Sequence, residues 1–252
     1  MSTTAIILAA GKGTRMKSDL PKVLHEVCGR PMVAYVMDAC RGAGADRLVM
    51  VVGHKAELVK KTLADEANNT AWVLQEPQLG TGHAVMVCKD ELEGLEGPVI
   101  VIAGDGPLVR AETLGKLLDT HRRQQAACTL ATSILPDPAA YGRIVRDDKG
   151  ELAGIVEYLD ADEQQRRINE VNVSIYCFDA AALRSVLPRL TNDNAKGEYY
   201  ITDALGLIRA DGGKLAAVAA VPPDEVLSIN TLDQLQEVSR LMRRREGQGG
   251  GA

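Results

Sequence analysis

Apolar residues fall into two alternating patterns along the chain: runs of strand length and segments with helical spacing. The runs occupy residues 5–10, 47–52, 72–74, 98–103 and 128–135. Between them, apolar residues recur every three or four positions, which predicts helices over residues 33–40, 55–63, 84–92 and 114–121. Strands that alternate with helices predict a mostly parallel sheet with right-handed crossovers, covered by helices.

The second half of the chain departs from this alternation. Two strand patterns, at residues 141–146 and 152–157, flank the turn sequence Asp-Lys-Gly and predict a hairpin. Further patterns predict a helix over 183–190, strands over 215–221 and 226–229, and a last helix over 231–245. We therefore expect one Rossmann-like α/β domain over 1–246, with a first part over about 1–135, a β-rich insertion within about 136–230, a C-terminal helix over about 231–246 and a disordered tail at 247–252.

Composition narrows the possible functions. The 252 residues carry a formal net charge of −5, which argues against non-specific nucleic-acid binding because such binding needs a cationic surface. The five cysteines are widely spaced without a Cys-x-x-Cys pair, so we expect buried thiols in a reducing compartment. No run approaches membrane-spanning length and no leader pattern begins the chain. These features predict a cytoplasmic protein without nucleic-acid or membrane partners.

The first apolar run leads into a glycine-containing loop with nearby cations. Gly11 and Gly13 allow a tight turn in which bare N–H groups can approach an oxyanion, while Arg15 and Lys22 can bind phosphate oxygens. The spacing matches neither Gly-x-Gly-x-x-Gly, since residue 16 is Met16, nor a P-loop. The residues still predict a site for a nucleoside triphosphate.

This stretch, Leu-Ala-Ala-Gly-x-Gly-Thr-Arg-Met at residues 8–16 with Pro-Lys at 21–22, resembles the signature of sugar-1-phosphate nucleotidyltransferases. It is most similar to the uridyltransferase domains of bacterial bifunctional enzymes, and Ala10 favours that branch. The resemblance implies a nucleotide-diphospho-sugar transferase fold with a β-rich sugar-binding insertion. It also implies that Arg15 and Lys22 are catalytic. The implied nucleotide contacts in this stretch are Leu8, Ala9, Ala10, Gly11 and Gly13.

A second loop, at residues 75–84, follows the third run. The amide of Gln75 carries the donor and acceptor needed to read a pyrimidine edge, and Gly80 and Gly82 would let backbone approach a base or ribose. We expect Thr81 to cap the following helix and His83 to contact backbone at its start. The resemblance implies that Gln75, Gly80 and Thr81 bind the nucleotide.

Asp105 follows the apolar run at 98–103, a position where a carboxylate could hold a cation that bridges phosphates. A helix cap is the alternative, but the next helix pattern starts too late for it. The resemblance implies that Asp105 and Asn230 bind Mg²⁺. Ala103 and Gly106 depart from residues common in the family, which leaves the fit of the sugar open.

The resemblance also implies a sugar site. The pattern Asn-x-Asn-x-x-Gly-Glu-Tyr-Tyr-x-Thr-Asp at residues 192–203 is similar to a family stretch that borders it. Leu159 and Ser174 differ from the residues that are common at these places in the family, and these differences leave the identity of the sugar more open than that of the nucleotide. The implied sugar contacts are Gly142, Glu157, Asn172 and Tyr199.

The resemblance covers residues 5–230 and implies Mg²⁺-dependent uridylyl transfer from UTP to N-acetylglucosamine 1-phosphate, which yields UDP-N-acetylglucosamine, a cell-wall precursor. The acetyltransferase domain of the bifunctional members is expected to be absent from these residues. Transfer to another sugar phosphate or to an alcohol phosphate remains an alternative, as does a non-catalytic nucleotide-sugar sensor. We expect a monomer or a weak homo-oligomer.

Overall fold

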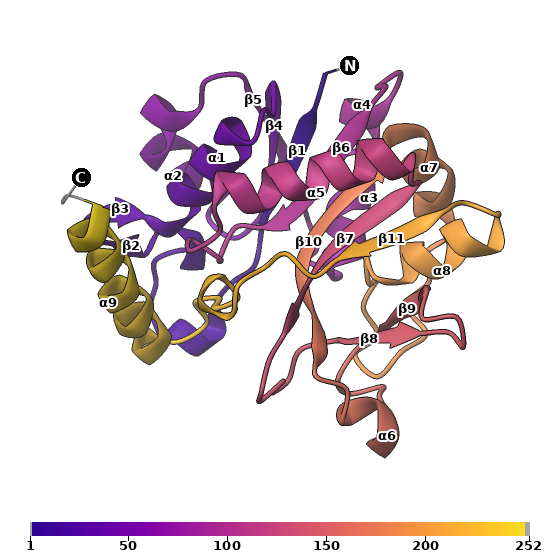
Figure 1. The fold of residues 1–252 in the computed structure, drawn as a ribbon. Coiled ribbons are helices and arrows are strands. Elements are labelled where there is room, and N and C mark those ends of the chain that lie inside the picture. The colour runs from indigo at the N-terminus through magenta and orange to yellow at the C-terminus, as the bar shows by residue number, and fades with distance from the viewer. Residues whose placement is uncertain (1, 250–252) are drawn as a thin grey trace.

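The computed structural model describes residues 2–249, which form a sheet with helices on both faces (Figure 1). The sheet has the order β11-β7-β10-β6-β1-β4-β5, and β8 and β9 extend it beside β10. Its strands are β1 (Thr4–Ala9), β4 (Arg47–Val52), β5 (Thr70–Leu74), β6 (Pro98–Ala103), β7 (Cys128–Ile134), β8 (Arg143–Arg146), β9 (Leu152–Val156), β10 (Glu170–Asp179) and β11 (Leu215–Val218).

Parallel pairing joins β5, β4, β1 and β6 in turn, and β11 pairs parallel to β7 at the other edge. The long strand β10 runs antiparallel to both β6 and β7, so the sheet is mixed. The predicted hairpin is present as the antiparallel pair β8 and β9. The mostly parallel α/β fold with a β-rich insertion is therefore confirmed.

Alternate residues of the central strands face two separate apolar clusters. Ile7 and Met50 face the cluster that packs against α1 (Met32–Gly42), α2 (Ala56–Thr62) and α5 (Ala111–Gln124). Ile6 and Val49 face the opposite cluster. That cluster is covered by α3 (Thr81–Met86), α4 (Lys89–Leu92), α7 (Ala180–Val186) and α8 (Asp203–Ala210). Burial on both faces explains why these strands are continuously apolar in the sequence.

A third, smaller cluster joins α9 (Leu232–Gly249) to the phosphate-loop region through Met16, Met32 and Val238. The two short strands β2 (Glu26–Val27) and β3 (Arg30–Pro31) lie beside α9, and α6 (Glu163–Arg166) follows the hairpin (Figure 1). Short 3₁₀ turns complete the described elements: η1 (Thr14–Met16), η2 (Lys22–Leu24), η3 (Ala64–Glu66), η4 (Leu187–Arg189) and η5 (Pro223–Glu225).

Several predicted elements differ from the structure, and β10 and α8 had no predicted counterpart. The helix expected over 183–190 ends as an α-helix at Val186 and continues as a 3₁₀ turn. The helix expected over 84–92 is divided into α3 and α4, and β11 stops at Val218. Residues 226–229 form no strand; Val226 and Ile229 are buried by packing, which produces an apolar pattern without a strand ladder. The tail was predicted to be disordered from residue 247, but α9 continues to Gly249; residues 250–252 lie outside the described part.

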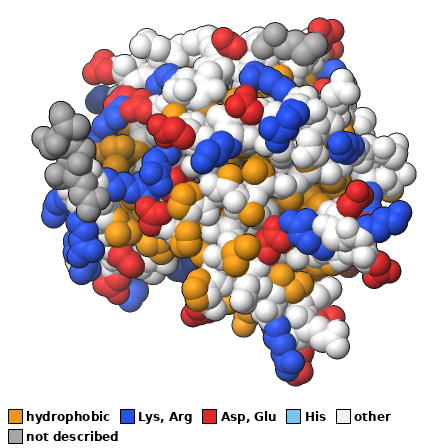
Figure 2. All heavy atoms as spheres, viewed as in Figure 1, with side chains coloured by type: hydrophobic (Ala, Val, Ile, Leu, Met, Phe, Trp, Pro, Cys, Tyr) orange, Lys and Arg blue, Asp and Glu red, His pale blue; other side chains and the backbone are white. Residues whose placement is uncertain are grey.

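Surface charges agree with the composition. On the face shown in Figure 2, Lys and Arg side chains are intermingled with Asp and Glu side chains rather than gathered into one basic area. Within residues 2–249 no helix is both long and apolar enough to cross a bilayer. Cys40, Cys88, Cys128 and Cys177 are buried free thiols, as expected, whereas Cys28 is partly exposed.

Candidate active site

The carboxyl ends of β1, β5 and β6 open onto a cleft of about 410 Å³. Parallel strands bring their carboxyl ends to the same edge of a sheet, which is where α/β proteins bind ligands. Ten of the predicted site residues line this cleft: Leu8, Ala9, Ala10, Gly11, Lys22, Gln75, Gly80, Thr81, Asp105 and Glu157. Six predicted residues do not: Gly13, Arg15, Gly142, Asn172, Tyr199 and Asn230.

Gly13 makes the packing of the phosphate loop possible. Its φ angle is +63°, in the left-handed region, and a Cβ atom there would lie 2.5 Å from the Cβ atom of Lys22. Any larger residue would therefore displace the Lys22 side chain. The loop is anchored on its other side by the fully buried Met16. Gly13 thus acts by allowing Lys22 to approach the loop, although it does not itself line the cleft.

Three side chains that are far apart in the sequence, Lys22, Asp105 and Asn230, converge beside the cleft, which the first two of them line. The Lys22 ammonium forms an ion pair with the Asp105 carboxylate, and its Nζ atom lies 2.7 Å from Asn230 Oδ1. Arg15 Nη2 donates to the same amide oxygen at 2.8 Å. Arg15 and Asn230 are therefore joined to the cleft through Lys22. Asp105 does not cap α5, which begins at Ala111.

The donor set of Asp105 and Asn230 fits a Mg²⁺ ion. Their two oxygens already converge on one cationic group, the Lys22 ammonium. Mg²⁺ in phosphate-transfer sites is held by one or two protein oxygens and completes its shell with phosphate and water. Among residues 2–249, no group of three or more His, Cys, Asp or Glu side chains could hold a metal. A Mg²⁺ site here would therefore depend on phosphate oxygens.

Gln75 lines the cleft and is only 2 % exposed. Its Nε2 atom donates to the carbonyl oxygen of Gly80 at 3.0 Å and lies 3.2 Å from His83 Nδ1. A carbonyl can only accept, so this bond fixes the orientation of the amide and makes His83 Nδ1 the acceptor. The prediction that His83 contacts backbone is therefore wrong; it contacts the Gln75 amide.

Thr81 and its neighbouring glycines contact the loop at 192–203. Thr81 does not cap α3 as predicted; its hydroxyl accepts from the backbone N–H of Ile201 at 3.1 Å. A Cβ atom at Gly80 would lie 2.5 Å from the Tyr199 carbonyl oxygen, and one at Gly82 would lie 3.0 Å from it. In this structure it is the Tyr199 backbone that approaches both glycines closely.

Glu157 also lines the cleft. A Cβ atom built on Gly142 would lie 3.5 Å from Glu157 Oε2 and 3.6 Å from the Cβ atom of Asn172, so these three predicted residues are neighbours. Burial raises the pKa of the Glu157 carboxyl, while the charge of Lys196 and a 3.4 Å hydrogen bond from Thr202 oppose that rise. The site therefore holds a carboxylate that is partly removed from water.

Asn172 lies behind the cleft wall. It is 5 % exposed, its amide nitrogen donates to the Tyr176 hydroxyl at 2.7 Å, and its Oδ1 accepts from the backbone of Ser174 at 3.0 Å. Ser174 has a φ angle of +58°, in the left-handed region that favours glycine. Ser174 itself lines the cleft.

The loop at 192–203 places Tyr200 in the cleft, not the predicted Tyr199. The Tyr199 ring lies beside the His83 ring, with their centroids 6.3 Å apart. The Tyr200 hydroxyl is buried and has no hydrogen-bond partner among the described residues. Lys196, Glu198 and Thr202 also line the cleft and were missed. Residues 192–202 form no helix or strand, so no periodicity could indicate which of two adjacent tyrosines faces inward.

The sequence profile of the family described as MobA-like NTP transferase domain matches residues 5–170. The bifunctional protein GlmU of Geobacillus thermodenitrificans is 49 % identical over 241 residues, which are 96 % of this chain and 52 % of that protein. The GlmU of Caldanaerobacter subterraneus is 46 % identical, with the same coverage. This chain spans about half the length of these curated relatives.

Solved structures of UDP-glucose pyrophosphorylase have a similar fold. One, complexed with UDP-glucose, superimposes with a TM-score of 0.78 at 19 % identity and covers 97 % of this chain and 100 % of that one. The apo form of UDP-glucose pyrophosphorylase gives a TM-score of 0.77 at 18 % identity, covering 98 % and 100 %. At this identity the likeness concerns the fold alone.

Proposed function

Because this chain belongs to the family of MobA-like NTP transferase domains and is a nucleotidyltransferase, we propose that it transfers a uridylyl group from UTP to N-acetylglucosamine 1-phosphate. The observation that carries this proposal is the convergence of the Asp105 and Asn230 side-chain oxygens on Lys22, beside a cleft that Lys22, Asp105, Gln75 and Glu157 line. We place the protein in the cytoplasm, as a monomer or a weak homo-oligomer, without nucleic-acid or membrane partners.

The proposed reaction needs no side-chain nucleophile. A phosphate oxygen of the sugar phosphate is an anion at neutral pH; it attacks the α-phosphorus of UTP, and the bond to the departing pyrophosphate breaks. Catalysis then consists of positioning and charge neutralisation. Lys22 and Arg15 neutralise the transferred and leaving phosphates, and Asp105 with Asn230 would hold Mg²⁺. A Mg²⁺ ion held there would supply positive charge against the phosphates.

We propose that one end of the cleft binds the uracil base and the other end binds the sugar phosphate. The Gln75 amide nitrogen is bonded to Gly80 and His83, so its oxygen is the atom that we propose accepts from N3–H of uracil. At the sugar end, Glu157 offers a carboxylate, and the Tyr200 hydroxyl lacks a protein partner among the described residues. We propose that both bind the sugar phosphate, and that Asn172 supports the cleft wall through its hydrogen bonds with Tyr176 and Ser174.

Release of pyrophosphate tests the proposal. Purified protein is given Mg²⁺, UTP and N-acetylglucosamine 1-phosphate, with each component omitted in turn. Release that requires all three supports the proposed reaction. Release with glucose 1-phosphate or an alcohol phosphate in place of N-acetylglucosamine 1-phosphate would move the assignment to that acceptor, which the departures at Ala103, Gly106, Leu159 and Ser174 make worth testing. Nucleotide binding without release from any acceptor would identify a sensor.

We expect Gln75→Met to reduce discrimination between UTP and CTP by about tenfold or more, because a buried hydrogen bond to the base is lost while side-chain size is kept. Uracil carries a hydrogen on N3 and cytosine does not, so an acceptor at Gln75 favours UTP. The measurement is kcat/KM for the two nucleotides. An equal decrease for both would show that Gln75 supports the loop without reading the base.

We expect Glu157→Gln to raise KM for the sugar phosphate by about tenfold, because hydrogen bonds to a charged group contribute about 1.5–3 kcal/mol. The same variant should be more stable than the wild type at pH 7. The folded-state pKa of Glu157 lies above its unfolded value of 4.5, so the folded state is less stable when the carboxyl is ionised. At pH 7 the wild type carries this cost and the glutamine variant does not.

Urea unfolding at two pH values checks the stability part. Glutamine does not titrate, so its stability advantage should be present at pH 7 and disappear near pH 3, well below the unfolded-state pKa, where the wild-type carboxyl is protonated in both states. An equal difference at both pH values would contradict the assigned direction of the pKa shift.

A further inference from the structure

The segment between β11 and α9, residues 219–231, carries Asn230 across the carboxyl edge of the sheet. Apart from a 3₁₀ turn it has no regular structure. Among the described residues, two of its backbone N–H groups donate to carbonyl oxygens beyond the flanking elements β11 and α9: Val221 to Thr132 at 3.2 Å, and Ile229 to Asp105 at 2.9 Å. At its end, the N–H groups of Asn230 and Thr231 donate to Gln234 Oε1 of α9 at 2.8 and 3.1 Å. Side chains must therefore fix the position of this connecting segment.

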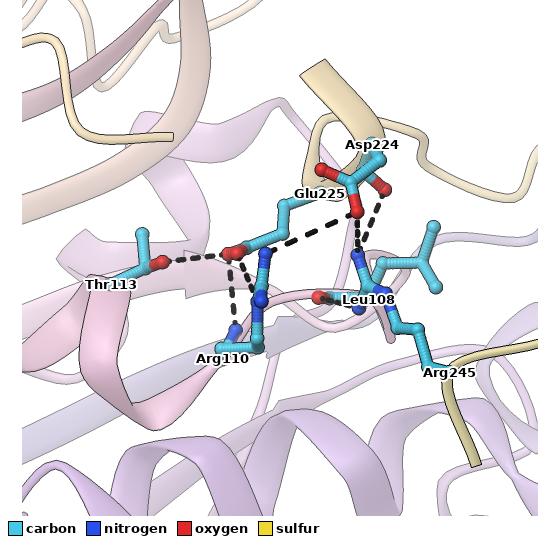
Figure 3. Close-up of polar contacts among 6 residues, drawn as sticks. All are labelled: Leu108, Arg110, Thr113, Asp224, Glu225 and Arg245. Carbon is cyan, nitrogen blue, oxygen red and sulfur yellow. Dashed lines mark hydrogen bonds and ion pairs between the residues drawn. The ribbon is translucent and has the colours of Figure 1, made fainter. Parts of the chain in front are cut away.

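Glu225 provides the main side-chain anchor. It is 4 % exposed, and its carboxylate accepts from the Arg110 backbone N–H at 3.2 Å, from Arg110 Nε, and from the Thr113 hydroxyl at 2.7 Å. Figure 3 shows the carboxylate between Thr113 and Arg110. A carboxylate so removed from water is stable only while such donors remain in place. Its position is therefore tightly defined.

Arg245, on helix α9, hydrogen-bonds both to the loop after β6 and to the connecting segment. Its Nη1 atom donates to the carbonyl of Leu108 at 2.9 Å, and its Nη2 atom donates to Asp224 Oδ2 at 2.7 Å (Figure 3). Asp224 also lies 4.0 Å from the Arg110 guanidinium. The connecting segment, the loop after β6 and α9 are thus joined at one place.

The partners of this network lie next to the two predicted metal ligands in the sequence. Leu108 and Arg110 follow Asp105 by three and five residues, and Glu225 precedes Asn230 by five. The network therefore joins the two chain segments that carry the ligands, and the bond between Ile229 and Asp105 joins them a second time. Without the network, Asn230 would be held by that bond, by its own contacts with Lys22 and Arg15, and by Gln234 Oε1 of α9, which accepts from its backbone N–H at 2.8 Å.

We propose that Glu225 is a positioning residue for the metal site: its buried carboxylate ties the segment that carries Asn230 to the loop that carries Asp105, and so sets the separation of their oxygens. This inference rests on the proposed metal site. Glu225 itself is bonded to protein groups and is not offered as a ligand. Residues that orient metal ligands commonly change metal affinity by 10- to 100-fold when replaced.

Mn²⁺ binding in the presence of UTP, followed by the loss of the free-ion paramagnetic resonance signal, tests the proposal without turnover. The variant is Glu225→Gln, which keeps the side-chain shape but turns an amide toward Arg110 Nε. We expect Mn²⁺ affinity to fall about tenfold, and the Mg²⁺ concentration for half-maximal activity to rise by a similar factor while kcat at saturating Mg²⁺ changes little.

Glu66→Gln is the matched control. The Glu66 carboxylate accepts from Arg30 Nε at 2.9 Å and Arg30 Nη2 at 2.5 Å, but neither residue lines the cleft. It should lower the melting temperature, as Glu225→Gln does, with Mn²⁺ affinity unchanged. Arg245→Met serves if Glu225→Gln does not fold, because it loosens the same network from the partly exposed side and should weaken Mn²⁺ binding in the same direction.

Asp105→Asn separates failure of this inference from failure of the metal site. If Asp105→Asn binds Mn²⁺ as tightly as the wild type, the proposed metal site is wrong. If Asp105→Asn weakens binding but both Glu225→Gln and Arg245→Met retain wild-type affinity and the same Mg²⁺ requirement, the metal site stands and the positioning role of Glu225 is overturned.

Discussion

Replacement of Asp105 by alanine should reduce pyrophosphate release by about a thousandfold or more, because it removes the carboxylate proposed to hold Mg²⁺ against the phosphates. The fold should persist. Asp105 lies in a loop, and the bond that it makes to the connecting segment uses its backbone carbonyl, which accepts from Ile229 and remains in the variant. The loss should appear in kcat at every Mg²⁺ concentration.

Asp147→Ala is a suitable control for this experiment. Asp147 is also a loop carboxylate in an ion pair, with Arg209 at 2.9 Å, but it lies in the hairpin turn and does not line the cleft. Its replacement should leave the rate unchanged. Undiminished Mg²⁺-dependent activity in Asp105→Ala would refute the metal assignment, whereas equal losses in the two variants would point to a general effect on folding.

Lys22→Met should lower kcat by about 100- to 1000-fold, the effect of removing one group that stabilises charge in a transition state. Methionine keeps an unbranched stem beside Gly13, so packing in the phosphate loop should be preserved. The ammonium contacts both proposed metal ligands. Mn²⁺ should therefore bind to Lys22→Met at least as tightly as to the wild type, which separates the role of Lys22 from that of Asp105.

Lys17→Met is the control for the charge change. Lys17 ends the 3₁₀ turn of the same loop, its side chain is exposed, and it does not line the cleft. The measurements are kcat with saturating substrates and Mn²⁺ affinity. A Lys22→Met enzyme with wild-type kcat would contradict a catalytic role. One that loses Mn²⁺ binding together with activity would indicate that Lys22 organises the metal site instead.

Most of the fold could be predicted from the local sequence. The predicted strands at 47–52 and 98–103 have the bounds of β4 and β6, because a strand covered on both faces must be apolar at nearly every position. The hairpin was predicted as well, because a turn sequence lies between two strand patterns, and it is present as β8 and β9. Local patterns could not predict segments whose conformation depends on long-range contacts. Residues 226–229 were predicted to be a strand because Val226 and Ile229 are apolar, but these side chains are buried by packing in a segment without a strand.

The sequence by itself determined the parallel strands of the sheet, the glycine loop and the candidate chemistry of Lys22, Gln75 and Asp105, since these depend on local spacing and residue type; the antiparallel strand β10 was not predicted. Only the tertiary structure decided which side chains meet. It brought Asn230 to Lys22, turned Tyr200 rather than Tyr199 into the cleft, placed Asn172 behind its wall, and buried Glu225 against Arg110. These contacts join segments up to about two hundred residues apart, and their geometry follows from the packing of the whole chain.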